Sequence, residues 1–92
     1  MVRELRWRIR AWRQILAIFE YISRENLAAA DELIAQIETS IEPALIYPEM
    51  FRPGGVAGTR ELVAHPNYIV IYRVLPTAIE VAAVIHTRQK YP

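Results

Sequence analysis

Six residues of types that bind or cleave phosphodiesters lie at or near the ends of β-rich runs in the second half of the chain. They are Arg60, Arg73, His86, Arg88, Lys90 and Tyr91. Guanidinium and ammonium groups neutralise a phosphate backbone, and a histidine or tyrosine can protonate a leaving group when RNA is cleaved. The same residues could equally be unrelated surface charge spread over both faces of a sheet. The residue types alone therefore leave both interpretations open.

Other kinds of catalytic or binding centre find little support in the sequence. The chain has no cysteine, and His65 and His86 are its only histidines, so the usual ligands of a structural zinc site are missing. The three glycines lack the spacing and the lysine of a phosphate-binding loop. Ser23 and Ser40 fall on predicted helices with no histidine nearby in the sequence. We therefore expect neither a metal nor a cofactor.

The first half of the chain is predicted to form a short strand followed by two helices. Residues 2–7 alternate in part between apolar and polar side chains, which is typical of a strand. Apolar residues then recur at spacings of three and four, over residues 9–24 and again from Leu27 to the neighbourhood of Pro43. Asn26 marks the break between the two runs. These patterns predict a helical hairpin.

The second half is predicted to form a loop followed by three strands. Residues 47–58 contain all three glycines and indicate a loop. The β-rich runs that follow, separated by turns containing proline, cover residues 59–65, 68–75 and 78–86. Short turns between such runs predict an antiparallel meander. The order β-α-α-β-β-β predicts one α+β domain over residues 1–92, with the helical hairpin packed on a small, mainly antiparallel sheet.

The middle strand of this meander is apolar on both faces. Ile69 and Ile71 lie on one face, whereas Val70 and Tyr72 lie on the other. A half-exposed antiparallel sheet should instead alternate apolar with polar residues. We infer a groove that an amphipathic helix of another chain fills. The alternative is a central strand whose faces are both covered by this chain. In the last strand we expect one face to carry Ile79, Val81, Ala83 and Ile85.

Composition also points to a partner chain. Hydrophobic residues make up 53% of only 92 residues, and no disulfide or metal site is available to stabilise so small a domain. No apolar run approaches the roughly 20 residues of a membrane helix. Arg8 and Arg10 interrupt what would be the apolar part of a signal peptide. We expect a cytoplasmic protein that does not enter the membrane.

Charge is distributed unevenly although the net charge is only +1. Residues 1–13 contain five arginines against one glutamate, and residues 52–92 contain five basic residues against two acidic ones. Residues 20–49 contain seven acidic residues against one arginine. Such asymmetry can steer association with charged partners. For the acidic middle, a solvated helix face is the simpler interpretation.

Three motifs stand out in the second half of the chain, at residues 58–63 (GTRELV), 66–74 (PNYIVIYRV) and 84–89 (VIHTRQ). Their combination resembles ParE-type toxins of the RelE/ParE superfamily of toxin–antitoxin proteins. Upstream, residues 18–29 (IFEYISRENLAA) resemble the helical hairpin of that family, and residues 47–54 (YPEMFRPG) its bridge to the sheet. The chain departs from the family pattern in the hairpin. Gln14-Ile15 stands in place of Asp-Leu, and Leu27 in place of proline.

The resemblance implies a toxin that poisons DNA gyrase, or alternatively a RelE-type ribonuclease that cuts messenger RNA on the ribosome. Arg60, Arg88 and Tyr91 match the ribonuclease pattern approximately. Leu62 and Ile69, however, stand where RelE-type members tend to carry basic residues, and their loss weakens stabilisation of the developing charge. A third hypothesis is a module that binds its antitoxin without being toxic. The same six polar residues are the candidates for target contact.

Every one of these hypotheses implies a cognate ParD-like antitoxin in a hetero-oligomer. We expect its amphipathic segments to cover the apolar sheet face and the helical hairpin. The candidates for antitoxin contact are Trp12, Phe19, Leu33, Ile37, Tyr68, Ile69, Ile71 and Tyr72. In such pairs DNA binding normally belongs to the antitoxin, so none is assigned to this chain.

Overall fold

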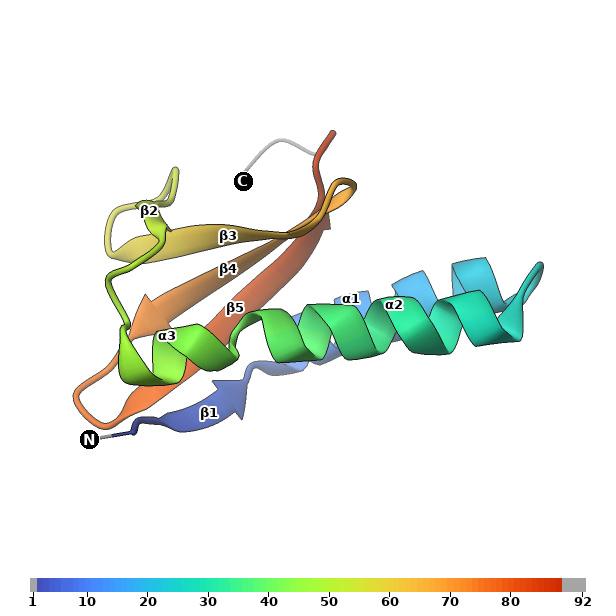
Figure 1. Ribbon diagram of the computed structural model, residues 1–92. Helices are drawn as coiled ribbons and strands as arrows, with labels where there is room; N and C mark the ends of the chain where they lie inside the picture. Colours follow the sequence, from blue (N-terminus) through green and yellow to red (C-terminus); the bar gives the residue numbers. More distant parts are fainter. Residues whose placement is uncertain (1, 89–92) are drawn as a thin grey trace.

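The computed structural model describes residues 2–88 of the 92-residue chain. Within this range a layer of three helices covers one face of a five-stranded sheet (Figure 1). The strands are β1 (Glu4–Trp7), β2 (Arg52–Pro53), β3 (Thr59–His65), β4 (Tyr68–Val74) and β5 (Ala78–His86). Their spatial order is β1-β5-β4-β3-β2; β1 pairs with β5 in parallel, and the other neighbours are antiparallel. The predicted α+β fold with a mainly antiparallel sheet is confirmed.

The helical layer begins with the predicted hairpin. α1 spans Ile9–Ser23 and α2 spans Leu27–Ser40, with Asn26 between them. The Asn26 side chain accepts a hydrogen bond of 2.9 Å from a backbone N–H in the first turn of α2. The second helix ends earlier than predicted, and a separate short helix, α3 (Glu42–Ile46), follows it. Pro43 lies in the first turn of α3, where a helix requires no N–H from it.

Alternation along β4 separates two apolar clusters. Val70 and Tyr72 are buried beneath the helices, in the main core. Ile69 and Ile71 belong to a second cluster on the opposite face of the sheet, which no helix of the described range covers. The sequence therefore predicted correctly that this strand is apolar on both faces. We call the face without helices the open face.

A β-bulge in β5 corrects the predicted face of the last strand. Ile71 is paired with Ala83 but its neighbour Tyr72 is paired with Val81, so Ala82 is an extra residue without a partner in the register. One inserted residue shifts every later side chain to the opposite face. Ile79 and Val81 therefore lie in the main core, whereas Ala83 and Ile85 lie in the cluster on the open face. The four residues do not share a face.

The segment predicted as a loop, residues 47–58, contains the short strand β2. This strand extends the sheet beyond β3, and the Nε of Arg52 donates a hydrogen bond of 2.7 Å to the Oε1 of Glu61. Gly58 precedes β3 with a φ of 81°, in the left-handed region that only glycine adopts without strain. The loop is therefore fixed to the sheet edge at several points. Two residues are too few to produce a recognisable alternating pattern, which is why the strand was not predicted.

Candidate functional site

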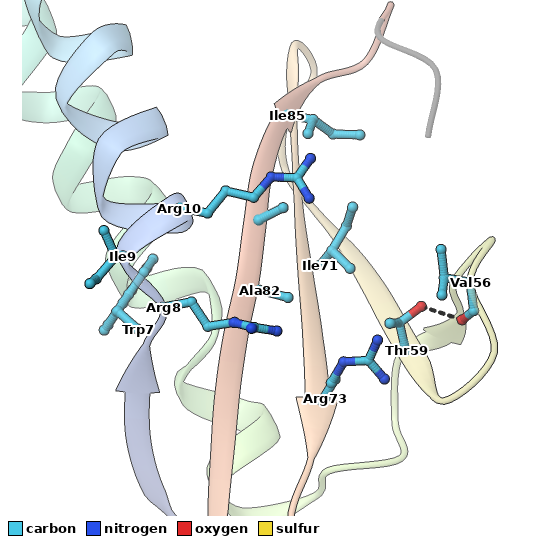
Figure 2. A pocket seen from close by; sticks show the side chains of 11 residues that line it. Trp7, Arg8, Ile9, Arg10, Val56, Thr59, Ile71, Arg73, Ala82 and Ile85 are labelled. Carbon is cyan, nitrogen blue, oxygen red and sulfur yellow. Dashed lines mark hydrogen bonds between the residues drawn. The ribbon is translucent and has the colours of Figure 1, made fainter. Parts of the chain in front are cut away.

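A groove of about 570 Å³ runs over the open face of the sheet (Figure 2). Its floor contains Ile71 from β4 together with Ala83 and Ile85 from β5, and each of the three is 4% exposed. Val56, from the turn before β3, stands on one side of the floor, and Ile9 from the start of α1 stands on the other. We call this cavity the open-face groove. Its floor is apolar because β4 and the bulged part of β5 both direct aliphatic side chains to this face.

Arginines from two distant parts of the sequence surround the apolar floor. Arg8 and Arg10 come from the junction of β1 and α1, and Arg73 comes from β4; all three extend over the floor in Figure 2. The Nη1 of Arg8 lies 3.9 Å from the Oε1 of Glu80, which is paired in register with Arg73. Among the described residues that line the groove, none is acidic. The groove therefore combines an apolar floor with a positively charged rim.

The parallel pairing of β1 with β5 brings the N-terminal arginines to this face. β1 ends at Trp7, which is paired in register with Val81, and the N–H of Arg8 donates a hydrogen bond of 3.0 Å to the carbonyl of Val81. The chain then turns into α1 beside the bulge. The rings of Trp7 and Trp12 are 5.3 Å apart across this turn and pack against each other. Arg8 and Arg10 are consequently held next to the groove.

Over the described residues, the structure does not assemble the polar candidates into one site. Arg60 is paired with Tyr72 and points to the helix-covered side, where its Nη1 donates to the carbonyl oxygens of two residues of the 47–58 loop. Arg73 lies on the open face and lines the groove. His86 points towards α1, and its Nδ1 accepts a hydrogen bond of 3.1 Å from the N–H of Arg88 in the turn after β5. Lys90 and Tyr91 lie outside the described residues.

His86 belongs to a second cavity, of about 610 Å³, between α1 and the ends of the strands. Its ring lies edge-on to that of Tyr68, with 5.4 Å between the centroids. Burial, and secondarily the neighbouring Tyr21, raise the pKa of the Tyr68 phenol. On the wall of this cavity the Oε1 of Gln14 accepts a hydrogen bond of 2.7 Å from the N–H of Val84. The rings of His86 and Tyr68 thus form a packed aromatic cluster, and neither residue lines the open-face groove.

The candidates for antitoxin contact differ in accessibility. Trp12 is 42% exposed on α1, Phe19 and Tyr68 are half-buried, and Ile69 and Ile71 lie on the open face. The remaining three lie in the main core of this chain, buried to 8% exposure or less: Leu33, Ile37 and Tyr72. They lie between the helices and the sheet, so a partner could reach them only if the core opened, whereas Ile71, although only 4% exposed, faces the side of the sheet without helices. Periodicity identified them as apolar but could not say which chain buries them.

Sequence reasoning missed Arg8, Arg10 and Val56 as parts of the groove. The excess of arginine over residues 1–13 was the available signal for the first two, but it did not indicate which sheet face they would reach. Val56 carried no signal, since its place depends on the turn before β3. Within residues 2–88, no three histidine, cysteine or acidic side chains come together as metal ligands. No helix in the same range is both long enough and apolar enough to cross a bilayer.

Comparison with known proteins relates this chain to toxins. The chain matches the family described as "ParE toxin of type II toxin-antitoxin system, parDE" over residues 5–91. It is 36% identical over 91 residues to the protein Y4kP of Sinorhizobium fredii, and the aligned region covers 98% of this chain and 94% of that protein. It is 30% identical over 80 residues to Toxin RelE2 of Caulobacter vibrioides, and the aligned region covers 87% of this chain and 90% of that protein.

Solved structures share the same arrangement of elements. A chain of the chromosomal ParDE system from P. aeruginosa matches with a TM-score of 0.80 and 20% identity, over 92% of this chain and 96% of that one. The RelBE2 toxin–antitoxin complex from Mycobacterium tuberculosis contains a chain that matches with a TM-score of 0.58 and 19% identity, over 94% and 99% of the two chains. Identities this low establish the fold only.

The family match over residues 5–91 therefore identifies the helical hairpin on a bulged, mainly antiparallel sheet as a toxin fold of the RelE/ParE superfamily. Within that superfamily, the chain belongs to the ParE toxin family and is the toxin component of a ParDE type II toxin–antitoxin system. Toxins of this family pair with a ParD antitoxin.

Proposed function

We propose that this toxin inhibits growth by binding DNA gyrase and trapping it on cleaved DNA, with no catalysis of its own. The observation that carries the proposal is the dispersal of three polar candidates that the structure describes. Arg60, Arg73 and His86 occupy three separate surroundings, on two faces of the sheet. A protein that acts by binding another enzyme requires no convergent catalytic groups, so dispersed polar residues are compatible with that function.

A ribonuclease would need the opposite arrangement. Charge that develops on a phosphate is stabilised by preorganised donors within hydrogen-bond distance, so several cationic groups must converge on one point. Leu62 is buried beneath the helices at 3% exposure, and Ile69 lies in the cluster on the open face. Neither supplies a cation beside Arg73; the arginines that do share its groove, Arg8 and Arg10, come from the β1–α1 junction and lie apart from Arg60 and His86. The described part of the sheet therefore supports binding better than phosphodiester cleavage.

The test is a gyrase reaction on supercoiled plasmid with purified, antitoxin-free toxin. Linear DNA is quantified after detergent and protease treatment, because these release DNA ends held in a trapped enzyme. We expect toxin-dependent linear DNA. Normal supercoiling at saturating toxin would contradict the proposal, and cleaved transcripts in a translating extract would then favour the ribonuclease. Expression that is harmless in the absence of antitoxin would instead support the non-toxic binding module.

We further propose that the ParD-like antitoxin fills the open-face groove with an amphipathic helix whose apolar stripe is flanked by acidic residues. Ile71, Ala83 and Ile85 offer an apolar floor, and a helix of another chain would remove them from the remaining water. Arg10 and Arg73 on the rim would then face carboxylates on the helix. The exposed Trp12 lies beside this groove and would extend the contact onto α1.

Charge reversal on the rim tests the location of the antitoxin. Arg10→Glu replaces attraction with repulsion, and each exposed charge pair contributes roughly 0.2–1 kcal/mol. We therefore expect antitoxin affinity to fall about fivefold, mainly through slower association at low salt. Arg13→Glu is the matched control, since Arg13 is exposed on the same helix but does not line the groove. Equal losses for both variants would show that only overall charge matters.

A further inference from the structure

Arg60 and Tyr72 together hold one segment of backbone outside the sheet. They are direct partners on β3 and β4, and both side chains point to the helix-covered side. The Nη1 of Arg60 donates to the carbonyl oxygens of Glu49, at 3.2 Å, and Phe51, at 2.7 Å. The hydroxyl of Tyr72 donates to the carbonyl oxygen of Pro48 at 2.7 Å. Three carbonyls of the link between α3 and β2 are thus bound by two side chains of the sheet.

These bonds give the link a fixed shape that its own sequence does not enforce. We call residues 46–51 the clamped segment. Carbonyls in an irregular segment have no ladder of partners, and a guanidinium can satisfy more than one of them at once. The ring of Phe51 also packs edge-on against that of Tyr72, with 6.3 Å between the centroids. Tyr72 itself is completely buried, so the anchor is part of the core.

The outer side of the clamped segment is apolar and exposed. Ile46, Tyr47 and Met50 are 54%, 65% and 55% exposed, within five consecutive residues. They line a shallow cavity beside α3, and none of them lines the open-face groove. Large apolar side chains on a surface that is held rigid by the core lose little conformational entropy when they bind. Methionine and tyrosine are also enriched where proteins meet other proteins.

We propose that Arg60 is a positioning residue, and that the clamped segment is the surface with which this toxin contacts its protein target, inserting Tyr47 and Met50 into an apolar recess. The inference rests on the proposed function, in which the toxin acts by binding a protein. The clamped segment and the open-face groove differ in chemistry: Glu49 is the sole charge on the former, whereas arginines surround the latter. The target is therefore assigned to the segment and the acid-flanked antitoxin to the groove.

The role of Arg60 is tested by comparing Arg60→Lys with Arg60→Ala. Both bonds come from Nη1, whose two N–H groups the planar guanidinium holds in fixed directions towards Glu49 and Phe51. Lysine keeps the positive charge, but its ammonium rotates freely on a flexible stem and does not fix those directions. We expect both variants to increase amide hydrogen exchange within the segment and to reduce linear DNA in the gyrase reaction about tenfold. If Arg60→Lys retains full activity although exchange has increased, its charge acts directly and the positioning role is wrong.

The contact surface is tested by Tyr47→Ser combined with Met50→Ser. Because both side chains are more than half exposed, the double variant should keep wild-type exchange and antitoxin affinity while losing activity about tenfold. Leu27→Ser is the matched control, since Leu27 is 59% exposed and begins α2, at the end of that helix away from α3, and should change nothing. Figure 1 shows α2 and α3 in sequence. Full activity of the double variant would overturn the proposal, as would an equal loss of antitoxin affinity.

Growth arrest in cells separates this inference from the proposed function. If the wild-type toxin yields no linear DNA but arrests growth, gyrase is not the target, and the same variants are compared by growth arrest. Loss of arrest in the Tyr47/Met50 double variant, with antitoxin binding retained, would still support the clamped segment as the target surface. Arrest at the wild-type level would refute it whatever the target is.

Discussion

The hydroxyl of Tyr72 offers a sharp test of how the core anchors the clamped segment. Tyr72→Phe keeps the buried ring and its edge contact with Phe51 but removes the 2.7 Å hydrogen bond to the carbonyl of Pro48. A hydrogen bond of this kind contributes about 1 kcal/mol net, and its loss leaves a partly buried carbonyl without that donor. In a domain of this size, 1 kcal/mol corresponds to a fall in Tm of roughly 4–8 °C.

The same substitution should change how stability depends on pH. Burial raises the pKa of Tyr72 above its ordinary value of 10.0, although the nearby Arg60 guanidinium and a backbone hydrogen bond of Phe51 oppose the rise. A raised pKa means that the folded chain holds the phenol proton more tightly than the unfolded chain does. This contribution to stability is present below about pH 10 and is lost as the pH rises through the folded-state pKa.

Urea unfolding between neutral and alkaline pH measures both effects. We expect Tyr72→Phe to be less stable than wild type at neutral pH and to lose less stability on going to alkaline pH. Part of the alkaline loss should remain, because the pKa of Tyr68 is raised as well. Tyr47→Phe is the control, since that ring is 65% exposed. Unchanged stability at neutral pH, or an alkaline loss identical to wild type, would refute the role given to the hydroxyl.

Three further predictions test how the fold is held. Asn26→Ala removes the cap of α2 and should lower the free energy of unfolding by about 1 kcal/mol in urea titration; no change would mean that the cap is dispensable. Ile79→Ala truncates a completely buried core residue and should cost about 2–5 kcal/mol, whereas Val63→Ala at a 57% exposed site should cost under about 0.5 kcal/mol. Similar midpoints for this pair would contradict the assigned core. Gly54→Ala would bring a Cβ against the Oγ1 of Thr59, which is buried at 6% exposure, and should destabilise by roughly 1–3 kcal/mol; a thermal scan showing wild-type Tm would mean that the threonine moves aside freely.

Local sequence patterns were sufficient to predict a helix or strand wherever its formation depends mainly on its own residues. The period of apolar residues predicted α1 and α2, with Asn26 between them, because one helix face must be buried regardless of what buries it. β3 and β5 were predicted with the bounds that the structure has, since prolines and turn residues flank both runs. The family resemblance was carried by motifs over almost the whole chain. It is confirmed by the match to the ParE toxin family.

The tertiary structure alone decided which residues meet, because each of those meetings depends on two distant segments. Period-2 alternation placed Ala83 and Ile85 on the same face as Val81, but the bulge at Ala82, set by pairing with β4, turned them to the open face. The sequence suggested Arg60 as a phosphate-binding cation. In the structure its pairing with Tyr72 directs the side chain to the helix-covered side, where it donates a hydrogen bond to the carbonyl of Phe51. By itself the sequence determined the two long helices, the four longer strands, their order and the family. The open-face groove required the parallel pairing of β1 with β5, a contact between the two ends of the chain that no local period encodes.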